Sequence, residues 1–263
     1  MSSPETVYAI GDVHGCPGMF CALLRSILAD ADASGIPRPK LVCLGDLIDR
    51  GPDSRAVLDM VMSGWFRDSF DATVLMGNHE RMLLDSPADD ESMLTWLRNG
   101  GAETVENYGV EFGRGSARSA LERFFDEIPR HHLEFLERMP TILRLGGDMF
   151  VHAGVDPARS LDDQLPDTLL WTRDHRAMDT TTMTARIVHG HTPTPFLGID
   201  VRPGRICVDT GSGYDGGLLS AVVLVPGKDV RSLSVGPCRD GGLDIPYNPA
   251  AGGGFSGATV RPR

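Results

Sequence analysis

The chain has 263 residues, 41% hydrophobic and 23% charged, a length and balance that fit one large soluble α/β domain. Its formal net charge of −11 argues against nucleic acid or an anionic membrane as a partner, because binders of either carry a basic surface. The five cysteines are odd in number and include no Cys-x-x-Cys pair, so we expect no disulfide framework and favour a reducing cytoplasm. The longest apolar run, residues 218–225, has the length of a strand and is far below the ~20 residues of a membrane helix.

The first half of the chain alternates strand and helix signals. Short apolar runs at 7–10, 41–44 and 73–76 have strand length. Between them, residues 19–33 place apolar side chains at a spacing of 3.6, and a second amphipathic helix begins after Asp53. This βαβαβ order predicts a parallel sheet covered by helices.

Residues 80–140 are predicted to be mostly helical, because three apolar stripes with helical spacing occur there before Gly or Pro breaks. We expect this insert to pack as a cap beside the edge of the sheet. The second half is richer in β signals and predicts a second sheet that faces the first. Its expected strands are a hairpin over 142–152 and segments at 186–190, 205–209 and 218–225. The expected organisation is a catalytic domain over 1–235 and a Gly/Pro-rich tail over 236–263.

Five short polar segments each follow a predicted strand. They are Gly11-Asp12-Val13-His14-Gly15, Gly45-Asp46-Leu47-Ile48-Asp49-Arg50-Gly51, Gly77-Asn78-His79-Glu80, His152-Ala153-Gly154 and His189-Gly190-His191-Thr192. Strands that end at one edge of a sheet would bring all five together. Gly-Asp and Gly-Asn pairs are common in turns, but five ordered clusters of carboxylate, amide and imidazole groups favour a metal site.

The candidate metal ligands are Asp12, His14, Asp46, Asn78, His152 and His191. Asp12 and His14 are close enough in sequence to reach one ion, and Asp46 could give one oxygen to each of two. Mixed nitrogen and oxygen ligands suit Mn, Fe, Co or Zn more than calcium, and no cysteine belongs to a cluster. Two such ions could share a water, lower its pKa to roughly 7 and place it beside a phosphate.

Charged side chains around these ligands fit phosphoryl chemistry. Arg50 and Arg173 could bind phosphate oxygens with their planar guanidinium groups, although Arg176 could take the place of Arg173. His79 could protonate the leaving oxygen as a general acid, and Asp49 could orient it and support its charged form. Arg50 and Asp49 could instead be a surface ion-pair residue and a helix cap, but their place in the cluster favours catalysis.

In this order, the segments GDVHG, GDLIDRG, GNHE, HAG and GHTP resemble the PPP family of metallophosphoesterases over roughly residues 7–225. That family includes serine/threonine protein phosphatases and the symmetrical diadenosine tetraphosphate hydrolases. The resemblance implies an α/β fold in which two mixed sheets form a β-sandwich flanked by helices, with a helical insert. It further implies a dinuclear metal centre at one sheet edge, with Mn as the favoured metal and Fe, Zn, Co or Ni as alternatives.

The resemblance also implies a role for each residue. One metal would take Asp12, His14 and Asp46, and the other would take Asp46, Asn78, His152 and His191, with Asp46 bridging. His79 would be the proton donor and Asp49 its partner, while Arg50, Arg173 and Asn78 would contact the phosphate. Asp209-Thr210-Gly211-Ser212 stands where eukaryotic members have Ser-Ala-Pro-Asn-Tyr, which is typical of the bacterial members.

The leading functional hypothesis is a phosphomonoester hydrolase, a serine/threonine protein phosphatase, that uses a metal-bridging hydroxide for in-line attack. Its substrate would be a phosphorylated protein or a small phosphoester. The first alternative is a hydrolase of dinucleoside polyphosphates, since the same centre would serve either substrate. An alternative from another class is a non-catalytic phosphoprotein-binding module. The oligomeric state and the roles of His189 and Tyr214 stay open.

Overall fold

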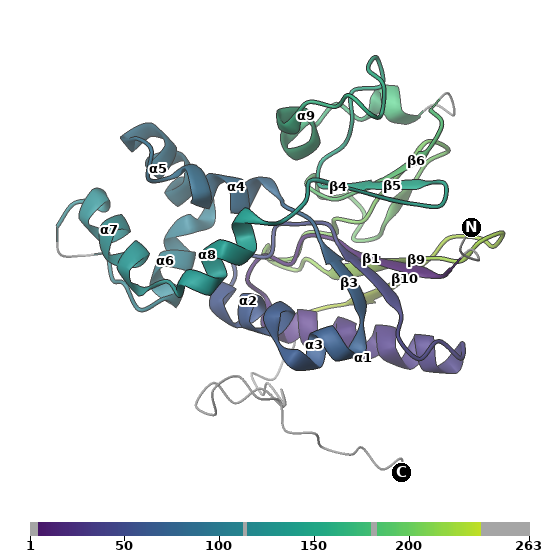
Figure 1. Ribbon diagram of the computed structural model, residues 1–263, viewed down its shortest axis with the longest axis horizontal. Helices are drawn as coiled ribbons and strands as arrows, with labels where there is room; N and C mark the ends of the chain where they lie inside the picture. The colour runs from purple at the N-terminus through teal and green to yellow at the C-terminus, as the bar shows by residue number, and fades with distance from the viewer. Residues whose placement is uncertain (1–4, 113–114, 180–182, 238–263) are drawn as a thin grey trace, which may run out of the picture.

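Two facing β-sheets with helices on the outside form the fold of the computed structural model, which describes residues 5–112, 115–179 and 183–237 (Figure 1). The first sheet has the order β10-β9-β1-β2-β3 and the second the order β4-β5-β6-β8-β7. This architecture confirms the predicted sandwich of two mixed sheets flanked by helices. None of the helices in the described residues is long and apolar enough to cross a membrane.

The first sheet begins with the predicted βαβαβ unit. Its strands are β1 (Val7–Ile10), β2 (Lys40–Cys43), β3 (Asp71–Val74), β9 (Leu219–Leu224) and β10 (Arg231–Val235). β1, β2 and β3 run parallel, and β9 and β10 add antiparallel strands beside β1. The helices α1 (Pro17–Ala33), α2 (Ser54–Met62) and α3 (Gly64–Ser69) lie below this sheet in Figure 1.

Side-chain alternation along β1 explains why the sheet lies between two apolar layers. Tyr8 and Ile10 point to the helices and join the core that contains Phe20, whereas Ala9 joins the core between the sheets. All four residues of β1 are buried, as expected for a strand covered on both faces. Each large apolar side chain buried in this way contributes about 1.5–3 kcal/mol to folding.

The second sheet comes from the predicted β-rich half. Its strands are β4 (Ile142–Leu145), β5 (Asp148–Val151), β6 (Arg186–His189), β7 (Asp200–Val201) and β8 (Arg205–Cys207). β4 and β5 form the predicted hairpin, and β5, β6 and β8 run parallel. Phe150 and Val188 pack between the two sheets.

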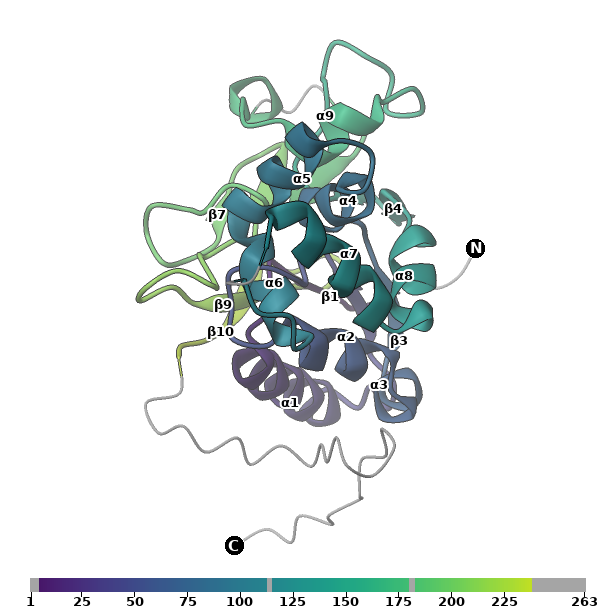
Figure 2. The same cartoon turned by 90° about the vertical axis from the view of Figure 1, so that its left-hand side faces the viewer.

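The predicted helical insert is present between β3 and β4. It consists of α4 (Asn78–Asp85), α5 (Asp90–Trp96), the π-helical turn η1 (Leu97–Gly101), α6 (Ala102–Asn107), α7 (Ala117–Glu127) and α8 (Arg130–Glu137). These helices gather on one side of the sandwich in both views (Figures 1 and 2).

Some elements differ from the expectation. The segment 154–185, to which the sequence analysis assigns no helix, contains α9 (Pro166–Trp171) and the 3₁₀ turn η2 (Arg176–Asp179). β7 and β10 were not expected, and the third strand begins two residues earlier than predicted. The predicted tail lies outside the described residues beyond position 237.

Candidate dinuclear metal centre

The ends of five strands bring the candidate ligands to one place, and these strands belong to both sheets, β1, β2 and β3 to the first and β5 and β6 to the second, where one sheet edge was expected. Asp12 and His14 follow β1, Asp46 follows β2, Asn78 begins α4 after β3, and His152 and His191 follow β5 and β6. Every one of these six side chains is buried, the most exposed being His191 at 5%. The structure therefore brings together all six ligands proposed from the sequence.

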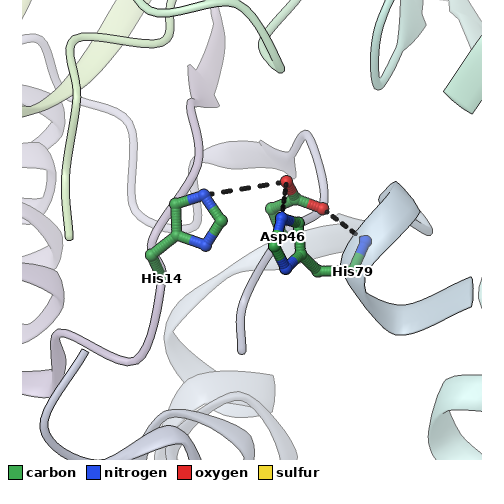
Figure 3. Close-up of side chains that lie close together, drawn as sticks. All are labelled: His14, Asp46 and His79. Atoms are coloured by element: carbon green, nitrogen blue, oxygen red, sulfur yellow. Dashed lines mark hydrogen bonds and ion pairs between the residues drawn. The ribbon is translucent and has the colours of Figure 1, made fainter. Parts of the chain in front are cut away.

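Asp46 lies at the centre of the group. Its Oδ2 is 3.7 Å from Nε2 of His14 and 3.4 Å from Nε2 of His152, so it faces ligands of both proposed ions. On the second side, Oδ1 of Asn78 lies 2.8 Å from both Nε2 of His152 and Nδ1 of His191. On the first side, Oδ2 of Asp12 is 4.0 Å from Nε2 of His14. Figure 3 shows Asp46 between His14 and His79.

The imidazole tautomers fit bound cations. Nδ1 of His14 lies 3.0 Å from the carbonyl oxygen of Ile48, and Nδ1 of His152 lies 2.8 Å from that of Leu44, so each Nδ1–H can donate there. Burial lowers the pKa of His152 to about 3 and that of His14 well below its usual value, so both rings are neutral. Each then presents an Nε2 lone pair toward the Asp46 carboxylate, an arrangement that a divalent cation between them would stabilise.

Charge in the site also fits bound cations. Asp12, Asp46 and Asp209 are buried close together, and burial raises the pKa of all three, to about 6 for Asp209. Mutual repulsion of the carboxylates adds to the shift for Asp12. Buried carboxylates stay ionised only when paired with positive charge, which two divalent ions would supply.

Two glycines leave space for the carboxylates of Asp46 and Asp12, and Glu80 holds the backbone of the Asp46 loop. A Cβ at Gly77 would collide with Oδ1 of Asp46, and one at Gly190 would collide with Oδ1 of Asp12. The buried Glu80 carboxylate accepts from the backbone amides of Asp46, Leu47 and Gly77 at 2.7–2.9 Å. Glu80 therefore fixes the Asp46 loop through these backbone amides.

His79 and Asp49 form a buried pair beside the cluster. Nδ1 of His79 is 2.7 Å from Oδ2 of Asp49, and the opposite ring atom, Nε2, lies 3.8 Å from Oδ2 of Asp46. Burial raises the pKa of Asp49 to about 7, and burial together with the charges of Arg50 and Arg173 lowers the pKa of His79. A dianionic phosphate would offset those guanidinium charges, and this favours the imidazolium form that a proton donor needs.

Two residues of the helical insert hold Asp49 and were missed from the sequence. The hydroxyl of Thr104 donates to Oδ1 of Asp49 at 2.6 Å, and Nε1 of Trp96 donates to Oδ2 at 3.0 Å. Both are fully buried. The helical insert therefore completes the Asp49–His79 pair, and a buried Trp with no local motif gave no sequence signal for this role.

We expect Trp96→Phe to lower kcat about tenfold while KM changes little, because one hydrogen bond to a charged carboxylate is lost and the ring volume is largely kept. Steady-state kinetics on an alkyl phosphate, with the pH profile of kcat, measures this effect. Trp65→Phe, outside the site, is the matched control. If both variants keep wild-type kcat and pH profile, Trp96 does not position Asp49.

The charges of two arginines, Arg50 and Arg173, act on the histidines of the cluster. The Arg50 guanidinium lies 2.5 Å from Nε2 of His14 and 2.9 Å from Nε2 of His79, so it spans both parts of the site. Arg173 is exposed, and its charge lowers the pKa of His79, His152 and His191. Arg176 is 96% exposed and lies 3.8 Å from Asp174.

Tyr214 and His189, whose roles the sequence did not decide, lie in different surroundings. The ring of Tyr214 stacks on the Arg50 guanidinium, with 5.0 Å between that group and the ring centroid, and the side chain is half exposed. His189 is fully buried and packs 4.5 Å from the ring of His175, away from the ligand group. Tyr214 therefore lies beside Arg50 at the surface of the site, whereas Nδ1 of the interior His189 lies 3.1 Å from the carbonyl oxygen of Gly190.

The backbone of the site is strained. Among the described residues, six non-glycine residues have positive φ angles, and five of them belong to the site: His14, Asp46, Asp49, Arg50 and His191, with φ between 45° and 73°. The sixth of these, Leu197, lies outside the site. Side chains with a Cβ rarely adopt this region, so such clustering is typical of functional loops.

The chain belongs to the calcineurin-like phosphoesterase family, whose model matches residues 5–224. Calcineurin-like phosphoesterases are hydrolases that use a dinuclear metal centre, and the His and Asp groups described above could bind metal. The metallophosphoesterase family and fold expected from the five motifs are thereby confirmed.

The relatives differ in how much of the chain they cover. A serine/threonine-protein phosphatase 1 from Salmonella typhimurium is 42% identical over 95 residues, which span 36% of this chain and 38% of the relative. A symmetrical bis(5'-nucleosyl)-tetraphosphatase from Bordetella parapertussis is 38% identical and spans 86% of this chain and 95% of its own length. A crystal structure of a putative diadenosine tetraphosphatase, 23% identical, superposes with a TM-score of 0.61 over 91% of this chain and 96% of its own.

Proposed function

We propose that the chain is a metal-dependent phosphomonoesterase that acts on phosphoserine and phosphothreonine side chains of proteins. The observation that carries this proposal is the buried His79–Asp49 pair beside a cluster that can hold two cations. Asp12, His14 and Asp46 would hold one ion, and Asp46, Asn78, His152 and His191 the other. Bound divalent ions would supply an activated water and a Lewis acid for the phosphoryl oxygens.

The protein residues would divide the remaining work. Arg50 and Arg173 would bind and orient the phosphoryl oxygens, and Asn78 would contribute from the first position of α4. Nε2 of His79 would donate a proton to the leaving oxygen, while Asp49 holds the opposite ring nitrogen. Trp96 and Thr104 would keep Asp49 in place.

The leaving group supports a phosphomonoester as the substrate. A serine or threonine alkoxide is a very poor leaving group, so its departure depends on a proton donor such as His79. A nucleotide phosphate leaves readily as an anion and depends on that donor far less. The buried imidazole of His79, held in place by Asp49, therefore favours an alkyl phosphate as the substrate.

A dinucleoside polyphosphate is the second candidate substrate. The observation in its favour is the Bordetella relative named as a symmetrical bis(5'-nucleosyl)-tetraphosphatase, which aligns over 95% of its own length. The exposed ring of Tyr214, stacked on Arg50, is also a surface on which a nucleobase could stack.

The deciding experiment is Mn²⁺-dependent phosphate release, measured in parallel on a phosphothreonine peptide and on diadenosine tetraphosphate. We expect kcat/KM to be higher for the peptide, with no turnover by Asp46→Asn. Cleavage of the dinucleotide alone would replace the first proposal with the second. Binding of the phosphopeptide without turnover, in a protein with two bound metal ions, would identify a non-catalytic binding module instead.

A further inference from the structure

A groove outside the metal centre lies along the free edge of the first sheet. It has a volume of about 540 Å³ and includes Met62, Phe66, Phe70, Val74, Phe135 and Met139 in its lining. The end of α2, β3, and the helices α3 and α8 with the residues that directly follow them contribute this lining, and α3 and α8 lie near β3 in both views (Figures 1 and 2). None of the groove residues belongs to the site described above.

β3 offers an unpaired strand edge to this groove. The amides of Asp71 and Leu75 donate to the carbonyls of Pro39 and Cys43 on the β2 side at 3.0 and 2.9 Å. By alternation, the backbone groups of Ala72 and Val74 point away from β2, and no strand among the described residues pairs with them. An edge of this kind can pair with another extended chain.

The end of α8 closes this edge just beyond Val74. The Met76 amide donates to the carbonyl of Pro140 at 2.9 Å, which leaves a short open stretch. Asn78 follows four residues after Val74, about 13 Å along an extended chain at roughly 3.3 Å per residue. A segment bound at β3 would therefore lie near the metal centre without entering it.

Three arginines line the groove on a chain whose net charge is −11. The Arg38 and Arg67 side chains donate to backbone carbonyls, those of Arg67 and Met62, and neither is joined to a described carboxylate by an ion pair within 4 Å. Arg138 is 79% exposed, with Glu134 at 4.0 Å. The carboxylate of Asp71, also in the lining, is bound by Lys40 at 2.7 Å, so the groove is basic.

We propose that this groove, the β3 groove, docks an extended segment of a phosphoprotein substrate that combines apolar and acidic residues. The open edge at Ala72 and Val74 would add the segment as a strand, the apolar lining would take alternate side chains, and the arginines would pair with its carboxylates. This inference rests on the proposed protein phosphatase function. Docking would raise the effective concentration of the phosphorylated residue at the metal centre.

Peptide selection on the Mn²⁺-loaded protein tests the β3 groove without using turnover. A random peptide display library is selected on the wild type, and the enriched peptides are measured by fluorescence anisotropy. Ala72→Pro removes one N–H that points away from β2, so every hydrogen bond to β2 is kept. Proline is tolerated at such a position because β3 is an edge strand. A second variant combines Arg67→Glu with Arg138→Glu, and Arg202→Glu on the other sheet is the matched control. Unchanged hydrolysis of para-nitrophenyl phosphate reports that each variant is folded.

We expect the enriched peptides to combine apolar and acidic residues, and to bind Ala72→Pro and the double variant at least about tenfold more weakly than wild type and Arg202→Glu. Fused to a phosphothreonine peptide, such a segment should lower KM on the wild type and on Arg202→Glu but not on the two groove variants, with kcat unchanged. Three peptide results would overturn the proposal: no enrichment, enrichment of basic peptides, or enriched peptides that bind both groove variants as tightly as they bind the wild type. A wild-type dimer that Ala72→Pro abolishes would also overturn it. If a fused peptide binds but is not dephosphorylated by active, Mn²⁺-loaded protein, the protein phosphatase function fails and the groove stands.

Discussion

Asp46→Asn is expected to reduce the metal content from about two ions per chain to one or fewer, and to lower turnover by about 10³-fold or more. The physical reason is that Oδ2 of Asp46 faces His14 on one side and His152 on the other at 3.7 and 3.4 Å. An amide removes the negative charge that both ions would share, and metal ions contribute several kcal/mol to transition-state stabilisation. Elemental analysis of dialysed protein and phosphate release measure the two effects separately.

The control for Asp46→Asn is Asp148→Asn. Asp148 is a largely buried carboxylate that pairs with Arg186 in the second sheet, away from the metal centre, so it should keep metal content and turnover. Retention of two ions by Asp46→Asn at wild-type affinity would contradict the bridging role, whatever the activity. Loss of metal by both variants would indicate a general folding defect.

The second large effect is expected for His79→Asn, which should keep both metal ions and lose about 10²–10⁴-fold in kcat on a phosphothreonine peptide. The backbone amide of His79, which donates to Asp46 at 3.0 Å, is unchanged in the variant, so the ligand arrangement persists. On an aryl phosphate with a good leaving group, the loss should be much smaller, because proton donation matters less there. Parallel kinetics on the two substrates, with metal analysis, measures this difference.

His131→Asn is the matched control, because His131 is exposed on α8 and outside the cluster around Asp46. An equal loss on alkyl and aryl substrates would argue against proton donation by His79 and for a role in binding the phosphate. Loss of metal in His79→Asn would instead make the imidazole a ligand, which its 3.8 Å distance from Oδ2 of Asp46 permits.

The parts of the site that could be predicted from the sequence are those fixed by strand ends. His152 comes directly after an apolar run, and Asp12 and Asp46 follow such runs after a single glycine. Parallel strands deliver residues in these positions to one edge whatever the details of packing. The same logic predicted both sheets, because β1 and β6 are short apolar runs bounded by Gly or polar residues.

Other features depend on packing that a local pattern does not contain. Trp96 and Thr104 reach Asp49 only because α5 and α6 fold back over the strand ends, a contact across 47 and 55 residues of sequence. β10 alternates exposed and half-buried residues at the sheet edge, so it carries a weak apolar signal. The short helix α9 depends on Leu169 and Leu170 packing in the interior, which its six residues do not reveal.

The five left-handed residues of the metal centre bear on how much mutation this chain can tolerate. Each costs roughly 1–3 kcal/mol, so together they can approach the 5–15 kcal/mol net stability of a typical domain. Burial in the two apolar layers must offset this cost before the free energy of unfolding becomes positive. A core truncation such as Leu44→Ala, at about 2–5 kcal/mol, therefore consumes a larger share of the reserve than in a fold without such loops. The strained loops of the site therefore limit how many destabilising substitutions the chain can tolerate, even when those substitutions lie in the core.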